Sequence, residues 1–158
     1  MIQLNLELNK SYIDEAKPED FSTYSLDTLL CNKFYGELIF IIDGVDCSLD
    51  DITLFDFIVR MNELTNNLTE DNSQTYLFPE GDGSIRLSRT EDIVLVKADY
   101  GAGETIESEI SYDELKNVLH VSLVTFMSEI EKLYPSVSQN VVYKKVISDL
   151  LFADDELE

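Results

Sequence analysis

The stretch 74–110, QTYLFPEGDGSIRLSRTEDIVLVKADYGAGETIESEI, decides the fold class of this chain. Four strand-like segments lie in it, at 74–78, 84–89, 92–98 and 104–110. The connections PEGDG, TE and YGAG between them are rich in turn-forming residues. A doubly wound parallel sheet would need a helix between most consecutive strands, and no helical pattern interrupts this stretch. We therefore expect an antiparallel meander inside an α+β domain.

Two further strands are expected before the meander. Residues 2–8 alternate apolar and polar side chains, which is typical of a strand with one solvated face. Residues 35–43 contain the apolar run LIFII, which favours a central strand. Between them, the mixed segment 10–34 predicts a loop or a short helix. A loop of that length in a compact domain is often functional.

Helices are expected before and after the meander. The segment 49–66, which begins within the capping sequence SLDD, has apolar residues at three- and four-residue spacing. A second helix is predicted from the capping box at 111–114 to Pro135, and Ser136 is expected to cap a third. The predicted order is β-β-α-β-β-β-β-α-α. It predicts an antiparallel sheet of five to six strands, with two to three helices packed mainly on one face.

Length and composition predict one domain. The chain has 158 residues, of which 44% are hydrophobic, and we expect a single domain over 1–153 followed by an acidic tail over 154–158. The N-terminus lacks the pattern of a signal peptide, and no apolar run approaches the length of a membrane-spanning helix. Cys31 and Cys47 belong to no CxxC pair. These features predict a cytoplasmic protein with reduced cysteines and no membrane partner.

The charge balance is the most unusual property of the sequence. Eleven Lys and Arg stand against 32 Asp and Glu, which gives a net charge of −21. Such a chain is repelled by nucleic-acid phosphates and by anionic lipid, because both attract positive surfaces. We therefore expect a basic protein as partner and no direct binding of nucleic acid.

The acidic residues gather in two blocks that contain no Lys or Arg, at 43–56 and 99–114. On the predicted strand 104–110, alternation places Thr105, Glu107 and Glu109 on the outward face. Acidic groups flanked by tyrosines are suited to a protein interface. The predicted partner contacts are Tyr100, Glu104, Glu107, Glu109, Tyr112 and Asp113. The alternative interpretation is a solvated acidic surface that serves only solubility.

No pattern in the chain identifies a reaction. His120 is the only histidine and belongs to no catalytic triad that spacing alone reveals. The acids at 43–51 lack the central glycine and final glutamate of a calcium loop, and Gly101-Ala102-Gly103 lacks the lysine of a phosphate loop. A carboxylate pair such as Glu107 and Glu109 is expected by chance among 32 acids. We therefore expect no catalytic residue, no metal and no cofactor.

The layout resembles the small acidic immunity proteins of bacterial polymorphic-toxin and contact-dependent inhibition systems. The resemblance rests on the strand YGELIFII at 35–42, the strands around 76–78 and 93–96, and the helix 115–134 that ends before Pro135. It covers most of the chain. It implies a protein that binds a cognate toxin, often a basic nuclease, and blocks the active site of that toxin. No family motif specifies contact residues.

The leading hypothesis is a non-enzymatic binding protein, an immunity-type inhibitor that binds a basic toxin or nuclease through an acidic surface. A second hypothesis is a mimic of nucleic acid that occupies a DNA-binding protein. A third is a hydrolase or metal-dependent enzyme built around His120 and nearby carboxylates. A fourth is a structural subunit that buries its apolar helix faces in an assembly.

Overall fold

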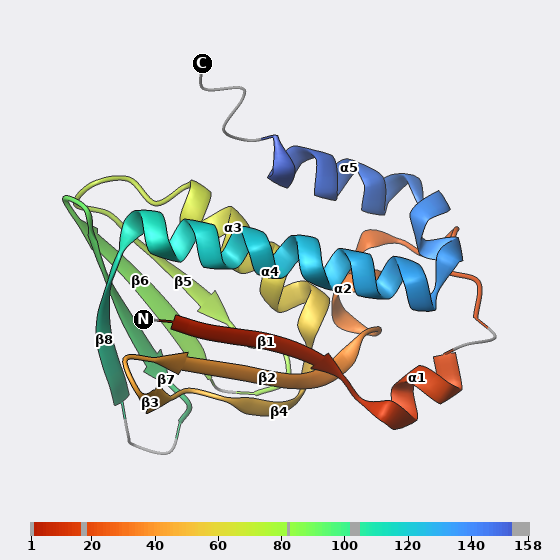
Figure 1. The fold of residues 1–158 in the computed structure, drawn as a ribbon, viewed down its shortest axis with the longest axis horizontal. Coiled ribbons are helices and arrows are strands. Elements are labelled where there is room, and N and C mark those ends of the chain that lie inside the picture. The colour runs from red at the N-terminus through yellow and green to blue at the C-terminus, as the bar shows by residue number, and fades with distance from the viewer. Residues whose placement is uncertain (1, 17–18, 82, 102–104, 153–158) are drawn as a thin grey trace.

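The computed structural model describes residues 2–16, 19–81, 83–101 and 105–152, and the predicted acidic tail lies outside these ranges. Two antiparallel sheets of four strands are combined with helices, as Figure 1 shows, so the α+β class is confirmed. The elements are β1 (Ile2–Leu8), α1 (Lys10–Ala16), α2 (Leu26–Cys31), β2 (Tyr35–Ile42), β3 (Val45–Asp46), β4 (Leu49–Thr53), α3 (Leu54–Asn66), β5 (Ser73–Leu77), β6 (Ser84–Thr90), β7 (Ile93–Asp99), β8 (Thr105–Ser111), α4 (Tyr112–Leu133), the 3₁₀ helix η1 (Pro135–Gln139) and α5 (Val141–Leu151).

Sheet A contains β1 to β4, with β2 in the centre. β1 pairs with β2 along its whole length, from Ile2 opposite Ile42 to Leu8 opposite Gly36. β3 and β4 pair with the other edge of β2. The apolar run LIFII therefore lies in a central strand, as predicted from its sequence.

The predicted start of the helix 49–66 was wrong, because residues 49–53 form β4 and α3 begins at Leu54. Ser48 caps no helix, and its hydroxyl accepts a hydrogen bond of 3.1 Å from the backbone N–H of Phe40. Thr53 precedes the helix, and its N–H and hydroxyl both donate to Oε1 of Glu80, at 2.7 and 2.5 Å. Pairing with β2 and a distant carboxylate thus outweigh the local capping sequence.

Sheet B is the predicted meander, in the order β5-β6-β7-β8. The expectation of one sheet of five to six strands was wrong, because α3 separates β4 from β5 and both sheets pack on it. The expectation of two to three helices was also wrong, since the described residues form five α-helices. The ring of Phe57 on α3 lies 6.2 Å from Phe40 of sheet A and 5.6 Å from Tyr76 of sheet B, centroid to centroid. One buried helix thus joins the cores of the two sheets.

Of the two predicted caps of the last helices, the cap of α4 is confirmed and the cap of α5 was wrong. α4 begins at the predicted capping box, where the Ser111 hydroxyl accepts from the N–H of Glu114 at 3.1 Å. Ser136 lies in η1 and does not cap α5. Asn140 takes that role, because its side-chain oxygen accepts from the N–H of Tyr143 at 3.0 Å.

The segment 10–34 contains two short helices, α1 and α2, and its described part is tied to the core. Phe21 is fully buried, and its N–H donates to the Ser136 hydroxyl at 2.9 Å. The Asn140 amide donates to the carbonyls of Phe21 and Tyr24, both at 2.8 Å. These contacts join residues more than a hundred positions apart, so no local pattern predicted them.

No helix among the described residues is long and apolar enough to cross a membrane. The two cysteines are free, Cys31 at the surface and Cys47 in the core.

Candidate functional site: an acidic edge between the two sheets

The outer face of sheet B carries part of the predicted contact set. Thr105, Glu107 and Glu109 are exposed on β8, while Ile110 is buried on the opposite face, as the alternation predicted. Glu104 lies outside the described residues. Lys97 on β7 is directly opposite Glu107, with 3.7 Å between Nζ and Oε1. The outer face is therefore mixed in charge.

The two predicted contact tyrosines stabilise the fold. Tyr100 packs its ring 5.9 Å from that of Phe78, and its hydroxyl donates to the Cys47 carbonyl at 2.5 Å. Burial raises the pKa of Tyr100. Tyr112 donates to the Thr65 carbonyl at 3.0 Å. Both rings are half-buried, so each tyrosine joins two elements and offers only part of its surface to a partner.

Asp113 lies apart from the acidic residues of β8, in the first turn of α4. It lines a polar pocket of about 310 Å³ together with His120, Lys116, Asn62, Asn66, Asn117, Leu150 and Leu151. Asp113 and His120 are seven residues apart on one helix, about 10 Å along its axis, so the carboxylate is too distant to orient the imidazole. This lining contains no Ser, Thr or Cys nucleophile. In the described part of the chain, no cluster of His, Cys, Asp and Glu is suited to a metal ion.

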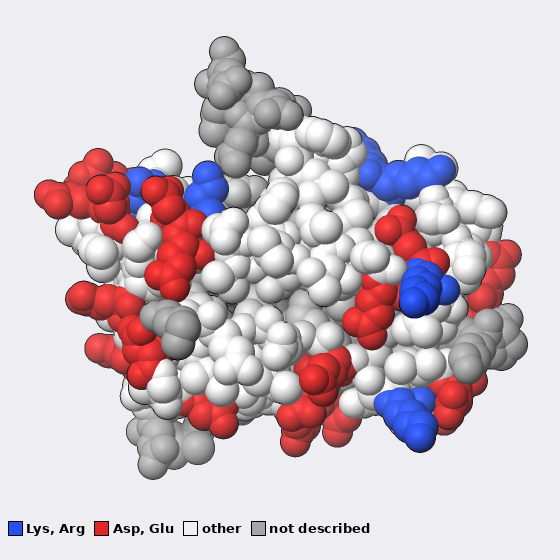
Figure 2. All heavy atoms as spheres, viewed as in Figure 1, with Lys and Arg blue, Asp and Glu red and all other residues white. Residues whose placement is uncertain are grey.

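The two acidic blocks of the sequence meet in space. The Ser108 hydroxyl on β8 donates to Oδ2 of Asp43 at 2.9 Å, and the Tyr100–Cys47 hydrogen bond joins the same hairpins nearby. We call the resulting surface the acidic edge. In Figure 2, acidic side chains follow the lower margin of the molecule, where Figure 1 places β3 and β4. The acidic edge consists of the exposed residues Asp43, Asp46, Asp50, Asp51 and Asp99.

Local hydrogen bonds hold several of these carboxylates. Asp46 accepts from the N–H of Ser48 at 2.9 Å, and its hydrogen bonding with Ser48 lowers the pKa of Asp46. Asp99 accepts from the N–H of Gly101 at 3.0 Å. Asp51 accepts from the side-chain amide of Asn9 at 2.9 Å. The donors are neutral, so the negative charge of these groups is not cancelled by them.

A hollow of about 280 Å³ lies beside the acidic edge, between β4 and the β5–β6 loop. Its apolar lining includes Ile52 from sheet A and Phe78 and Tyr100 from sheet B, while Asp50 and Asp51 supply carboxylates. Glu80 also lines it, although this side chain accepts hydrogen bonds from Thr53. An apolar surface next to carboxylates suits the stem and cation of Lys or Arg.

The sequence identified both acidic blocks but placed all the predicted contacts in the second block, 99–114. Nothing in the spacing indicates that Asp43 and Ser108 are neighbours, since 65 positions separate them. The hollow was missed for the same reason, because its two walls come from different sheets. The only available signal was the shared absence of Lys and Arg from both blocks.

Comparisons with known proteins found no match: no family model, no curated protein and no solved structure is similar to this chain at a significant level.

Proposed function

We propose that this chain is a non-enzymatic binding protein that captures a basic protein through its acidic edge, as an immunity-type inhibitor would. The observation that carries the proposal is the meeting of two cation-free acidic blocks at Ser108 and Asp43. Their convergence concentrates negative potential where a cationic surface can dock.

Attraction and specificity come from different parts of this surface. A net charge of −21 accelerates the encounter with a basic partner and makes the association rate depend on salt. The hollow beside Asp50 and Asp51 supplies the apolar contact that slows dissociation, with Phe78 and Tyr100 in its lining. A Lys or Arg side chain of the partner would fill it.

The acidic edge is also preorganised. Its carboxylates are on the β2–β3–β4 segment and at the end of β7, and the Tyr100 hydroxyl joins these two parts through Cys47. A partner therefore orders little of the surface when it binds, and preorganisation of this kind lowers the entropic cost of association. The resemblance to immunity proteins implies that such a partner is a toxin or nuclease met in a bacterial cytoplasm.

The test compares two variants with the same net charge. In the edge variant, Asp43, Asp46, Asp50 and Asp51 become Asn, which removes four charges from the acidic edge. In the control variant, four exposed acids near the β6–β7 turn are neutralised instead, by the substitutions E70Q, D71N, E91Q and D92N. Each tagged protein is used to capture basic proteins from a lysate of its native host at low salt, followed by elution with rising salt.

The edge variant is expected to lose the stoichiometric basic partner, while the control variant retains it with nearly the wild-type salt dependence. Equal retention by both variants would show that net charge alone attracts the partner and that the acidic edge is not the interface. Neutralising Glu107, Glu109 and Asp113 in a third protein tests the contact set predicted from sequence against the acidic edge.

A further inference from the structure

A second surface, distinct from the acidic edge, lies between β1 and α4. A groove of about 400 Å³ follows Leu4, Leu6 and Glu7 on one side and Val121 and Glu129 on the other. Figure 1 shows β1 at the front of the molecule below α4. Among the described strands, β1 pairs with β2 alone, so its other edge is open toward the groove.

The hydrogen-bond pattern of sheet A shows which backbone groups of β1 face the open edge. Phe40 of β2 lies opposite Leu4, yet its N–H donates to Ser48 and its carbonyl accepts from Cys47 at 2.7 Å, both on the far side from β1. Leu4 and Phe40 are therefore a non-hydrogen-bonded pair. Because bonded and non-bonded pairs alternate in antiparallel sheets, the N–H and C=O groups of Leu4 and Leu6 point into the open edge.

β1 lacks several of the features by which proteins commonly protect an edge strand, although α4 packs against it. Its sequence, IQLNLEL, contains no Lys and no Pro, and its register with β2 has no bulge. An unprotected edge is a template for the backbone of another extended segment. In natural proteins such an edge is commonly the site where a peptide adds as a further strand.

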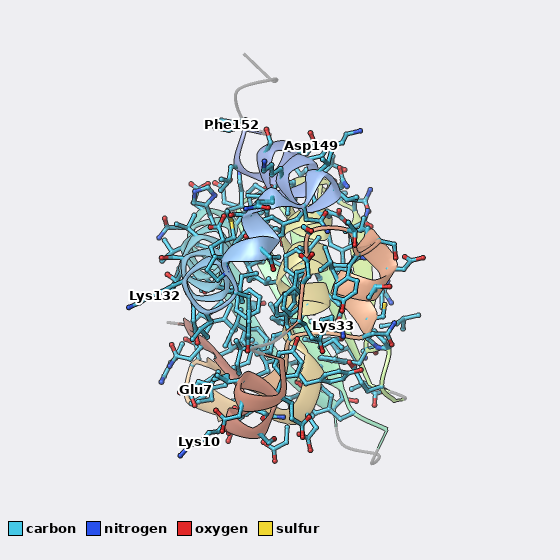
Figure 3. All side chains as sticks on the ribbon, turned by 90° about the vertical axis from the view of Figure 1, so that its right-hand side faces the viewer. Glu7, Lys10, Lys33, Lys132, Asp149 and Phe152 are labelled. Carbon is cyan, nitrogen blue, oxygen red and sulfur yellow. The ribbon has the colours of Figure 1, made fainter. Side chains whose placement is uncertain are left out.

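The face around the groove has little charge, in contrast to the rest of the protein. Figure 2 shows a broad area without Lys, Arg, Asp or Glu in the middle of this face. Val121 on α4 is 52% exposed beside the groove. Two carboxylates, Glu7 and Glu129, lie at one end of the groove, and no ion pair joins either to a described Lys or Arg. Figure 3 shows Glu7 and Lys132 on the same side of the molecule.

The charge of Glu7 acts on Glu129. Burial raises the pKa of Glu129, and the charge of Glu7 raises it further. Two like charges in a partly buried groove favour a cation that lies between them. An extended segment with a Lys or Arg at this end would supply that cation.

We propose that the open edge of β1 binds an extended segment of a partner protein, which adds to sheet A as a fifth strand with a Lys or Arg near Glu7 and Glu129. A second copy of this chain is a poorer occupant, since β1 carries no cation and each copy has a net charge of −21. This inference does not depend on the acidic edge, because it rests on the backbone of β1.

The first test measures amide exchange in the full chain by NMR. The amides of Leu4 and Leu6 are expected to exchange faster than those of Asn5 and Glu7, which face β2. Random peptides of about ten residues, displayed on phage, are then selected on the protein, and an enriched peptide is synthesised. We expect enriched peptides to carry Lys or Arg and to protect the amides of Leu4 and Leu6 from exchange.

Matched variants on α4 locate the peptide. Val121→Arg places a bulky cation in the groove, while Val124→Arg makes the same change at a position that is 43% exposed and does not line it. Both sites are on the surface, so both variants are expected to fold. Val121→Arg should weaken binding of the synthetic peptide by about tenfold or more, and Val124→Arg should leave it nearly unchanged.

Three outcomes would overturn the proposal. The first is an enriched peptide whose affinity falls equally in both variants or whose binding leaves Leu4 and Leu6 unprotected. The second is a selection that enriches no peptide. The third is a dimer by light scattering that Val121→Arg alone converts to a monomer, which would assign the groove to a second copy. Loss of partner capture by the edge variant, with peptide binding intact, would separate this inference from the proposed function.

Discussion

The acidic edge and the groove beside β1 are two exposed surfaces built in different ways. The acidic edge consists of charged side chains from segments far apart in the sequence, held together by Ser108 and Tyr100. The groove borders β1, whose backbone groups at Leu4 and Leu6 face away from β2, and the surface around it has little charge. The net charge of −21 is therefore not spread evenly over the molecule. Long-range attraction and backbone pairing are offered by separate parts of the molecule.

The largest expected effect tests sheet A, which contributes to both surfaces, at the close approach of β1 to β2. A Cβ atom added at Gly36 would lie 2.1 Å from the Glu7 carbonyl oxygen and 2.6 Å from Cδ1 of Leu54. Because the carbonyl is backbone, β1 itself must move. Gly36→Ala is expected to lower the free energy of unfolding by about 3 kcal/mol or more, measured by urea denaturation.

The control for this change is Gly81→Ala, since nothing lies within 4 Å of a Cβ atom added there. It should alter stability by less than about 0.5 kcal/mol. If Gly36→Ala is as stable as this control, β1 is not held against β2 as described, and the account of the open edge fails with it.

A smaller effect should distinguish the acidic edge from the groove beside β1, because one substitution is expected to affect only the acidic edge. Tyr100→Phe removes the hydroxyl that bonds the Cys47 carbonyl but keeps the ring against Phe78. We expect a loss of about 1 kcal/mol in stability and weaker capture of a basic partner, because the two halves of the acidic edge lose a direct connection. Peptide binding in the groove should be unchanged.

Tyr112→Phe is the matched control for Tyr100→Phe, because it removes a similar hydrogen bond, to the Thr65 carbonyl, at the other end of sheet B. It should cost about the same stability and leave partner capture intact. Equal loss of capture in both variants would mean that stability, and not the geometry of the acidic edge, limits binding.

The smallest effect contrasts an acid of the core with those of the acidic edge. Asp56 on α3 is buried and accepts from the Tyr76 hydroxyl at 2.6 Å, and burial raises its pKa above the ordinary 3.8. The folded state therefore binds this proton more tightly than the unfolded chain does. The contribution of Asp56 to stability must fall as the pH rises above 3.8 toward its folded pKa.

The measurement is the free energy of unfolding of wild type and Asp56→Asn at several pH values. Wild type should lose stability relative to Asp56→Asn as the pH rises. For Asp46 the expected change of stability with pH has the opposite sign, because its pKa is lowered and its contribution to stability is lost as the pH falls. A difference for Asp56→Asn that does not change with pH would refute the raised pKa.

Local patterns predicted the elements that local interactions decide. The meander of sheet B was predicted because alternating strands and turn residues lie next to each other in the chain, and α4 because Ser111 and Glu114 form its capping box within one turn. The prediction of a helix over 49–53 was wrong because Ser48 lies in a local capping sequence, while in the fold its hydroxyl accepts a hydrogen bond from Phe40 of β2. The order of the described part of 10–34 was not predicted, because the residues that hold it, Ser136 and Asn140, are distant in the chain.

The α+β class, the two acidic blocks and the solvated face of β8 could be predicted from sequence, since they depend on composition and on side-chain alternation. Only the tertiary structure decided that the sheet divides in two, that the acidic blocks meet at Asp43 and Ser108, and that β1 is an open edge. Alternation shows which face of a strand is buried. Whether a strand has one neighbour or two depends on the partners that the folded chain brings to it, and β1 has one among the described strands.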